Sequence, residues 1–108
     1  MKLPTDLHFA NQSIPGATMY QLRCGKSTIK ILEPNRSLAP APPGGIQGST
    51  GYRYWTLSVS NLAELLTTCE AAGSRIAVPA TELRPGMTIA MVEDPDGNWV
   101  EFLQADAG

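Results

Sequence analysis

The sequence has little of what marks several specialised protein classes. Only two of its 108 residues are cysteines, too few for a disulfide-stapled scaffold. Its 8 Lys and Arg residues are scattered and are outnumbered by 10 Asp and Glu residues, so no basic footprint for nucleic acid exists. No apolar run approaches the roughly 20 residues that a membrane span needs. We therefore expect neither nucleic acid nor a membrane among its partners.

A secretion signal and a cysteine motif are also missing. Pro4 and Asp6 interrupt the amino-terminal stretch, which lacks the charged and then apolar order of a signal peptide. Cys24 and Cys69 have no spacing typical of a metal or redox motif. We expect both thiols to be reduced, Cys69 to pack on a helix, and the protein to be cytoplasmic. His8 is the one histidine, and we expect it to face solvent in a loop.

What is present is the composition of an ordinary folded domain with an internal repeat. Hydrophobic residues make up 43% of the chain and charged residues 17%. Residues 15–22 read PGATMYQL and residues 85–92 read PGMTIAMV. Each segment is followed by a polar turn and an apolar strand, and with one gap in the turn Lys30 corresponds to Glu101. The period is too long for a solenoid repeat, so we expect two copies of one module.

The second copy is predicted to be complete, in the order β-α-β-β-β. Residues 52–59 alternate and are rich in aromatic and β-branched types, as in a strand. Asn61 is placed as a helix N-cap with Glu64 in the capping-box position, and Gly73 ends the helix. The inner stripe of that helix is predicted to be Leu62, Leu65, Leu66 and Cys69.

Three further strands complete this copy. We expect a short strand at 75–78, a loop at 79–85, and a hairpin of strands 87–92 and 99–104. The hairpin turn is Asp94–Asn98, where Gly97 can take positive φ, and we interpret this turn as structural.

The first copy is predicted to be incomplete. It has 14 residues ahead of its Pro-Gly pair, whereas the second copy has 34 from Gly51 to Arg84. The deficit of 20 is close to one strand plus one helix. Residues 34–50 contain four Pro and three Gly, so we expect a linker there that is extended near its prolines and flexible near Gly44 and Gly45. The organisation is thus a single domain: a partial module at 1–33, a linker at 34–50 and a complete module at 51–105.

Strand parity predicts which side chains face a ligand. The apolar stripe of the predicted helix is expected to pack on one face of the strands. Alternate strand residues supply that face: Trp55, Leu57, Val59, Val100 and Phe102. The other face is then free of the helix and carries Tyr54, Thr56, Ser58, Trp99, Glu101 and Leu103. From the first copy, the repeat places Thr28, Lys30 and Leu32 on the corresponding face. Such a mixture of charged, hydroxyl and aromatic groups suits a small amphipathic ligand.

These segments resemble one known superfamily. Residues 51–79, GYRYWTLSVSNLAELLTTCEAAGSRIAVP, and residues 91–104, MVEDPDGNWVEFLQ, are similar to the second module of the vicinal oxygen chelate superfamily. That group includes glyoxalase I, bleomycin-resistance proteins and extradiol dioxygenases. Residues 19–34 resemble the end of its first module. The resemblance implies an α+β fold of paired βαβββ modules in a half-open cupped mixed sheet, the first module lacking its initial strand and helix.

The resemblance also implies a divalent metal in many members, held by a His on the first strand and a Glu on the last strand of each module. Glu101 matches the second-module Glu, but Tyr54 stands where the second-module His would be. Lys30 stands where the first-module Glu would be, with Glu33 nearby, and the first-module His has no counterpart. An ammonium repels a cation, so we expect no cofactor, and an ion pair between Lys30 and Glu101.

Three functions stay open. The leading hypothesis is metal-independent binding of a small organic molecule by Trp99, Lys30, Thr56, Leu103 and Ser58. The alternative is a glyoxalase-like lyase or isomerase with Glu101 and Tyr54 as catalytic residues and a metal held by Glu101 and completed across a homodimer. The third is a structural module for oligomerisation. A homodimer is expected because a missing strand leaves an unpaired sheet edge, and the alternative is that residues 6–13 fold back over the gap.

Overall fold

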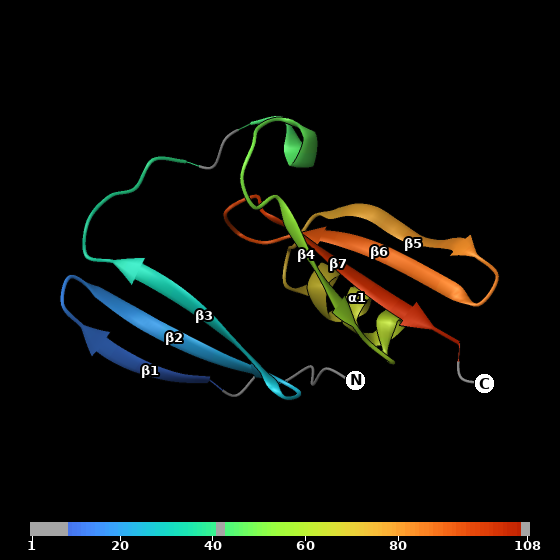
Figure 1. Cartoon of the computed structure of the whole chain (residues 1–108), viewed down its shortest axis with the longest axis horizontal. Helices are drawn as coiled ribbons and strands as arrows, with labels where there is room; N and C mark the ends of the chain where they lie inside the picture. Colours follow the sequence, from blue (N-terminus) through green and yellow to red (C-terminus); the bar gives the residue numbers. More distant parts are fainter. Residues whose placement is uncertain (1–8, 41–42, 107–108) are drawn as a thin grey trace. The chain divides into compact units, whose positions relative to one another are not determined.

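A computed structural model describes residues 9–40 and 43–106. Within these ranges the chain has seven strands in two sheets and one α-helix, which confirms the predicted α+β class. The chain divides into two compact units, with the boundary between residues 39 and 40. We call them the N-terminal unit and the C-terminal unit and describe each by itself (Figure 1).

The N-terminal unit is an antiparallel sheet of three strands in the order β1-β2-β3. Its strands are β1 (Phe9–Ile14), β2 (Ala17–Cys24) and β3 (Ser27–Pro34). Strand β1 was not predicted from the sequence. The other two strands were, and the Pro15–Gly16 pair forms the turn that joins β1 to β2.

The C-terminal unit is the predicted βαβββ module. After a short 3₁₀ turn, η1 (Gly45–Gln47), come β4 (Tyr54–Ser58), α1 (Leu62–Ala71), β5 (Ile76–Arg84), β6 (Met87–Glu93) and β7 (Trp99–Ala105). The sheet order is β4-β7-β6-β5, with β4 parallel to β7 and the other pairs antiparallel. The sheet is therefore mixed, as the resemblance implied.

Helix α1 covers one face of this sheet and closes the main core. Leu62 and Leu65 are buried on the helix, together with Phe102 on β7 and Val59, which follows β4. Leu66 and Cys69 are half-buried, so the predicted stripe does face inward. The helix ends in a Schellman motif, in which Ser74 N–H donates to Cys69 C=O and Gly73 N–H donates to Glu70 C=O.

The start of the helix is capped differently from the prediction. Asn61 is the N-cap residue, but its side chain makes no capping hydrogen bond and its amide donates to Glu64 Oε2 at 3.3 Å. The N–H of Leu62 donates instead to Gln104 Oε1 on β7, at 2.8 Å. Asn61 is thus the N-cap residue as predicted, but a residue from a distant strand, rather than the Asn61 side chain, supplies the acceptor for the first helical N–H.

The prediction of a loop at 79–85 is wrong. Strand β5 runs through that region to Arg84 and pairs with β6, with register shifts at three places. Pro79 cannot donate to a ladder, which favoured a loop in the sequence. It is tolerated because β5 is the edge strand of the sheet and is irregular there.

The backbone pairing confirms the internal repeat. In the N-terminal unit Met19 pairs with Leu32, and in the C-terminal unit Ile89 pairs with Leu103. The two ladders therefore correspond with an offset of 70 positions on the first strand and 71 on the second. The difference of one position is the single gap predicted in the turn. The flanking contacts match as well: Asn35 N–H donates to Gly16 C=O, and Asp106 N–H donates to Gly86 C=O.

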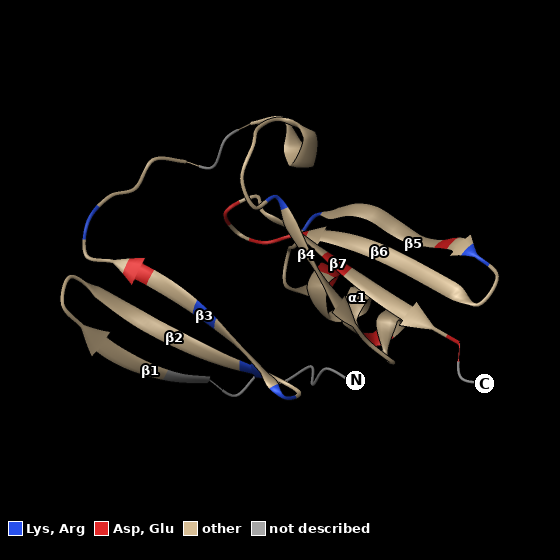
Figure 2. Cartoon of the chain, in the orientation of Figure 1, with Lys and Arg blue, Asp and Glu red and all other residues tan. Residues whose placement is uncertain are grey.

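Figure 2 shows Lys and Arg spread singly along both units, with acidic residues at the β6–β7 turn. Within the described ranges, α1 is too short to cross a bilayer, and no other helix qualifies.

Candidate functional site

The sheet face away from α1 in the C-terminal unit, which we call the free face, carries the predicted site residues. The parallel ladder between β4 and β7 pairs Thr56 with Glu101, and Thr56 Oγ1 donates to Glu101 Oε1 at 2.8 Å. Gln104, on the opposite parity of β7, reaches the helix instead. Because side chains alternate along a strand, the free face therefore bears the set Tyr54, Thr56, Ser58, Trp99, Glu101 and Leu103.

Apolar side chains flank this polar pair. Met91 pairs with Glu101 and Ile89 pairs with Leu103, so both lie on the free face beside the predicted residues. Both are buried. Neither residue was predicted to lie there, although the repeat alignment and the parity of β6 place both on this face. Glu101 is a half-buried carboxylate between a hydroxyl and a thioether, which suits a ligand with both polar and apolar parts.

A hollow of about 390 Å³ lies at the Tyr54 and Trp99 end of the free face. Its lining consists of Tyr52, Arg53, Tyr54, Trp55, Asp94, Asn98 and Trp99. Trp55 was predicted to pack under the helix layer, yet 43% of its surface is exposed. The prediction for Trp55 is wrong in that respect, because the side chain lies near the start of β4, where the strand also borders the hollow.

Arg53 is the functional candidate that the sequence reasoning missed. Its Nη2 donates to the Gly45 carbonyl at 2.7 Å, whereas its Nε is buried and has no hydrogen-bond partner. The available signal was its position, since Arg53 is the one charged residue within the aromatic run Tyr52–Trp55.

The residues before β4 contact Trp99. A Cβ atom at Gly45 would lie 3.3 Å from Cζ2 of the Trp99 indole, so the backbone of η1 already packs on one side of the ring. A second hollow of about 430 Å³ lies there, bordered by η1, Arg75, Glu93 and Trp99. Trp99 can therefore offer a ligand only the parts of its ring that η1 leaves uncovered.

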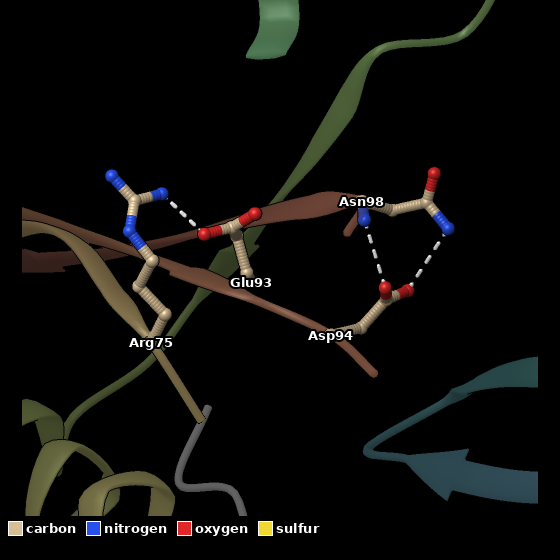
Figure 3. A network of polar contacts seen from close by, with 4 residues as sticks. All are labelled: Arg75, Glu93, Asp94 and Asn98. Atoms are coloured by element: carbon tan, nitrogen blue, oxygen red, sulfur yellow. Dashed lines mark hydrogen bonds and ion pairs between the residues drawn. The ribbon is translucent and has the colours of Figure 1, made fainter. Parts of the chain in front are cut away.

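The β6–β7 turn is held by its own side chains, as Figure 3 shows. Asp94 Oδ1 accepts from Asp96 N–H at 2.9 Å and from Asn98 N–H at 2.8 Å, and Asp94 Oδ2 accepts from Asn98 Nδ2 at 3.1 Å. Next to it, Arg75 forms an ion pair with Glu93. These contacts confirm the structural interpretation of the turn.

The predicted residues of the first module lie in the other unit. Lys30 is exposed on β3 and pairs with Gln21, and Thr28 and Leu32 share its face. Glu101 lies on β7 of the C-terminal unit, so the ion pair between Lys30 and Glu101 stays a prediction. His8 lies outside the described residues.

The thiols offer no nucleophile. Both cysteines are free, and Cys24 is buried. Burial raises the pKa of the Cys24 thiol and of the Cys69 thiol, so both stay protonated near neutral pH.

The donor set does not fit a divalent metal. In residues 9–40 and 43–106, no group of three or more His, Cys, Asp or Glu side chains is placed to hold an ion. On the free face Glu101 offers a carboxylate already bonded to Thr56, and Tyr54 offers a phenol in place of an imidazole. A hard cation needs more oxygen or imidazole donors than these.

Comparison with known proteins gives one family. The family model described as Glyoxalase/Bleomycin resistance protein/Dioxygenase superfamily matches residues 5–102. None of the curated protein sequences matches the chain significantly.

Solved structures share the fold. A glyoxylase/bleomycin resistance protein/dioxygenase domain from Frankia sp. EAN1pec superposes with a TM-score of 0.73 at 17% identity, over 96% of this chain and 77% of that one. TioX from Micromonospora sp. ML1 gives 0.62 at 21% identity, over 94% and 79%. Lactoylglutathione lyase from Agrobacterium tumefaciens gives 0.58 at 22% identity, over 91% and 75%.

Proposed function

Since the chain belongs to the Glyoxalase/Bleomycin resistance protein/Dioxygenase superfamily, we propose that it binds a small organic molecule on the free face without a metal ion. The observation that carries this proposal is the Thr56–Glu101 hydrogen bond on the face that α1 leaves uncovered. It supplies a fixed polar pair among aromatic and aliphatic side chains, next to a hollow of ligand size.

In this proposal the two ends of the free face have different roles. Glu101 accepts a hydrogen bond from a donor group of the ligand, because Thr56 occupies one of its oxygens and holds the carboxylate in place. Tyr54 and Trp99, which are paired in the β4–β7 ladder, provide the aromatic wall at the hollow. Ser58 and Leu103 extend the face at its other end, and Lys30 stays a candidate for the contribution of the first module.

A ligand screen followed by two substitutions tests the proposal. Thermal-shift screening of small organic molecules should give ligands whose affinity falls about tenfold or more in Glu101→Gln and less in Thr56→Val. Glu70→Gln makes the same chemical change at an exposed helix position and should leave the affinity unchanged. Ligands that bind equally well to the wild type and to Glu101→Gln would contradict the proposal.

The alternative is a glyoxalase-like lyase or isomerase with Glu101 as base and Tyr54 as a second catalytic residue. It requires metal donors from a second copy of the chain. Elemental analysis of the purified protein, with an activity assay in the presence of added divalent ions, separates the two functions. Stoichiometric metal together with turnover would replace the binding proposal by the enzymatic one.

We also propose a homodimer. Strand β3 is an edge strand, and it exposes Ile31 and Leu32, which point to opposite faces of the sheet. Exposed apolar groups on an unpaired edge favour association with another chain. Sedimentation should give twice the mass of 11.5 kDa at micromolar concentration, and a stable monomer there would contradict the proposal. A cytoplasmic location stays a prediction from cysteine usage alone.

A further inference from the structure

The hollow beside Tyr54 gathers most of the large aromatic side chains that carry a polar group. The chain has three Tyr and two Trp, and four of these five line this one hollow: Tyr52, Tyr54, Trp55 and Trp99. The rings of Tyr52, Tyr54 and Trp55 are exposed rather than packed in the core. A concentration of exposed rings around a hollow of about 390 Å³ favours a planar apolar ligand of one or two fused rings.

The same hollow contains a cation without a counter-ion. Arg53 lines it and uses Nη2 to bind the Gly45 carbonyl, while its Nε–H is buried without an acceptor. Among the described residues, Arg75–Glu93 is the ion pair that the structure contains, so Arg53 has no carboxylate partner there. Because the chain itself covers the Nε–H, a ligand in the hollow would pair with the terminal nitrogens of the guanidinium, of which Nη2 already binds Gly45.

The neighbouring carboxylate does not fulfil this need. Asp94 also lines the hollow, but its two oxygens accept three hydrogen bonds from Asp96 and Asn98 within the turn. Turning Asp94 toward Arg53 would break the contacts that hold the hairpin. The carboxylate that lines the hollow is therefore not free to pair with Arg53.

We propose that this hollow binds a planar aromatic molecule that carries a carboxylate, with Arg53 pairing with the carboxylate and the surrounding rings packing on the aromatic part. The inference rests on the proposed function and names the ligand class for one end of the free face. Arg53 is well suited to the task because a guanidinium binds a carboxylate through planar, charge-assisted hydrogen bonds.

Two probes of the same shape test the charge requirement. Isothermal titration of the whole chain with 2-naphthoate and with 2-naphthamide should show 2-naphthoate binding about tenfold more tightly. The affinity for 2-naphthoate should fall with added salt, whereas the affinity for 2-naphthamide should not. This comparison uses the unaltered protein. Equal affinities for the two probes, or an affinity for 2-naphthoate that salt does not change, would overturn the inference.

Substitutions then locate the charge. Arg53→Met should bring the two affinities to within about twofold, and Arg53→Lys should keep part of the preference, because it retains the charge. The matched control Arg75→Met removes an arginine that Glu93 already neutralises and should preserve the preference. A preference that survives in Arg53→Met would overturn the inference, as would loss of the preference in Arg75→Met alone. Since Arg53 also holds η1, circular dichroism of each variant confirms that it is folded.

The outcomes separate this inference from the proposed function. If neither probe binds, the ligand class is wrong. The proposed function would fail only if the wider screen also yields no ligand whose affinity depends on Glu101.

Discussion

The two units share one hairpin scaffold but differ in what covers it. The β2–β3 ladder and the β6–β7 ladder have the same register, and Ile31 corresponds to Phe102. Ile31 is 49% exposed, whereas Phe102 is 7% exposed. Of the ten buried apolar residues in the described ranges, only Ala17 and Cys24 belong to the N-terminal unit. Equivalent strands thus have very different burial.

The difference indicates that the helix layer buries the hairpin face on which Phe102 lies. In the C-terminal unit α1 covers the face on which Phe102 lies, and a sheet needs such a second layer to bury its apolar side. In the described N-terminal unit no helix follows the strands. A ligand site that depends on fixed side chains is therefore better supported in the C-terminal unit.

The largest difference between the two units is expected when the equivalent side chains Phe102 and Ile31 are truncated. Phe102→Ala should lower the free energy of unfolding by about 3–5 kcal/mol, because it empties a buried position. Ile31→Ala should cost under about 1 kcal/mol, since the side chain is half in solvent already. Urea denaturation followed by circular dichroism measures both. Equal losses would show that the N-terminal unit has a core of its own at this position.

The two β-hairpin turns should respond next most strongly. Asp94→Ala removes the acceptor of three hydrogen bonds in the C-terminal turn and should cost about 2 kcal/mol. The corresponding turn of the N-terminal unit, Cys24–Ser27, contains no acid, so the exposed Lys26→Ala is the matched control and should be near neutral. Urea midpoints of the two variants measure the difference. A neutral Asp94→Ala would mean that the turn backbone holds itself without the carboxylate.

Substituting the glycine of either Pro-Gly turn should destabilise that turn by a similar amount, because the two turns share one backbone conformation. Gly16 has φ +79° and Gly86 has φ +84°, a region that L side chains rarely adopt. A Cβ atom at either site meets no close contact, so backbone strain alone sets the cost. Gly16→Ala and Gly86→Ala should each raise the energy of the local turn by about 1 kcal/mol. Hydrogen exchange of the flanking strands reads out each turn separately, and a cost at only one turn would contradict the backbone repeat.

The smallest expected effect is a difference between the two units in how easily they unfold locally, which the two thiols of the unaltered protein can report. Burial raises the pKa of both cysteines, so at pH 8 both should react slowly with iodoacetamide in the folded protein. In rising urea Cys24 should react before Cys69, because its unit contains fewer buried side chains. Mass spectrometry of the labelled peptides measures both rates, with fully unfolded chain as the reference. Coincident transitions would show that the two units open together.

The same pKa direction gives a sign for stability against pH. A thiol with a raised pKa in the folded state keeps its proton while the unfolded chain loses it. Stability should therefore be unaffected by these groups at neutral pH and should fall as the pH rises past the ordinary pKa of a thiol.

Much of the fold was predictable because it depends on local spacing. Alternation along 52–59 and 99–104 gave strands β4 and β7, and the apolar stripe from Leu62 gave the helix. The same alternation placed Thr56 and Glu101 on one face, where they are hydrogen-bonded. Strand β5 was underestimated, since Pro79 is disfavoured in a strand unless that strand lies at an edge.

The amino-acid sequence by itself determined the repeat, the order of the second module and the parity of its strands, because these follow from neighbouring residues and the geometry of the strand. Only the tertiary structure decided that Gln104 caps a helix starting 42 positions earlier, that η1 packs on Trp99, and that Arg53 has a buried donor without an acceptor. Those features depend on contacts between residues that are distant in the sequence, and periodicity along the chain carries no information about such contacts.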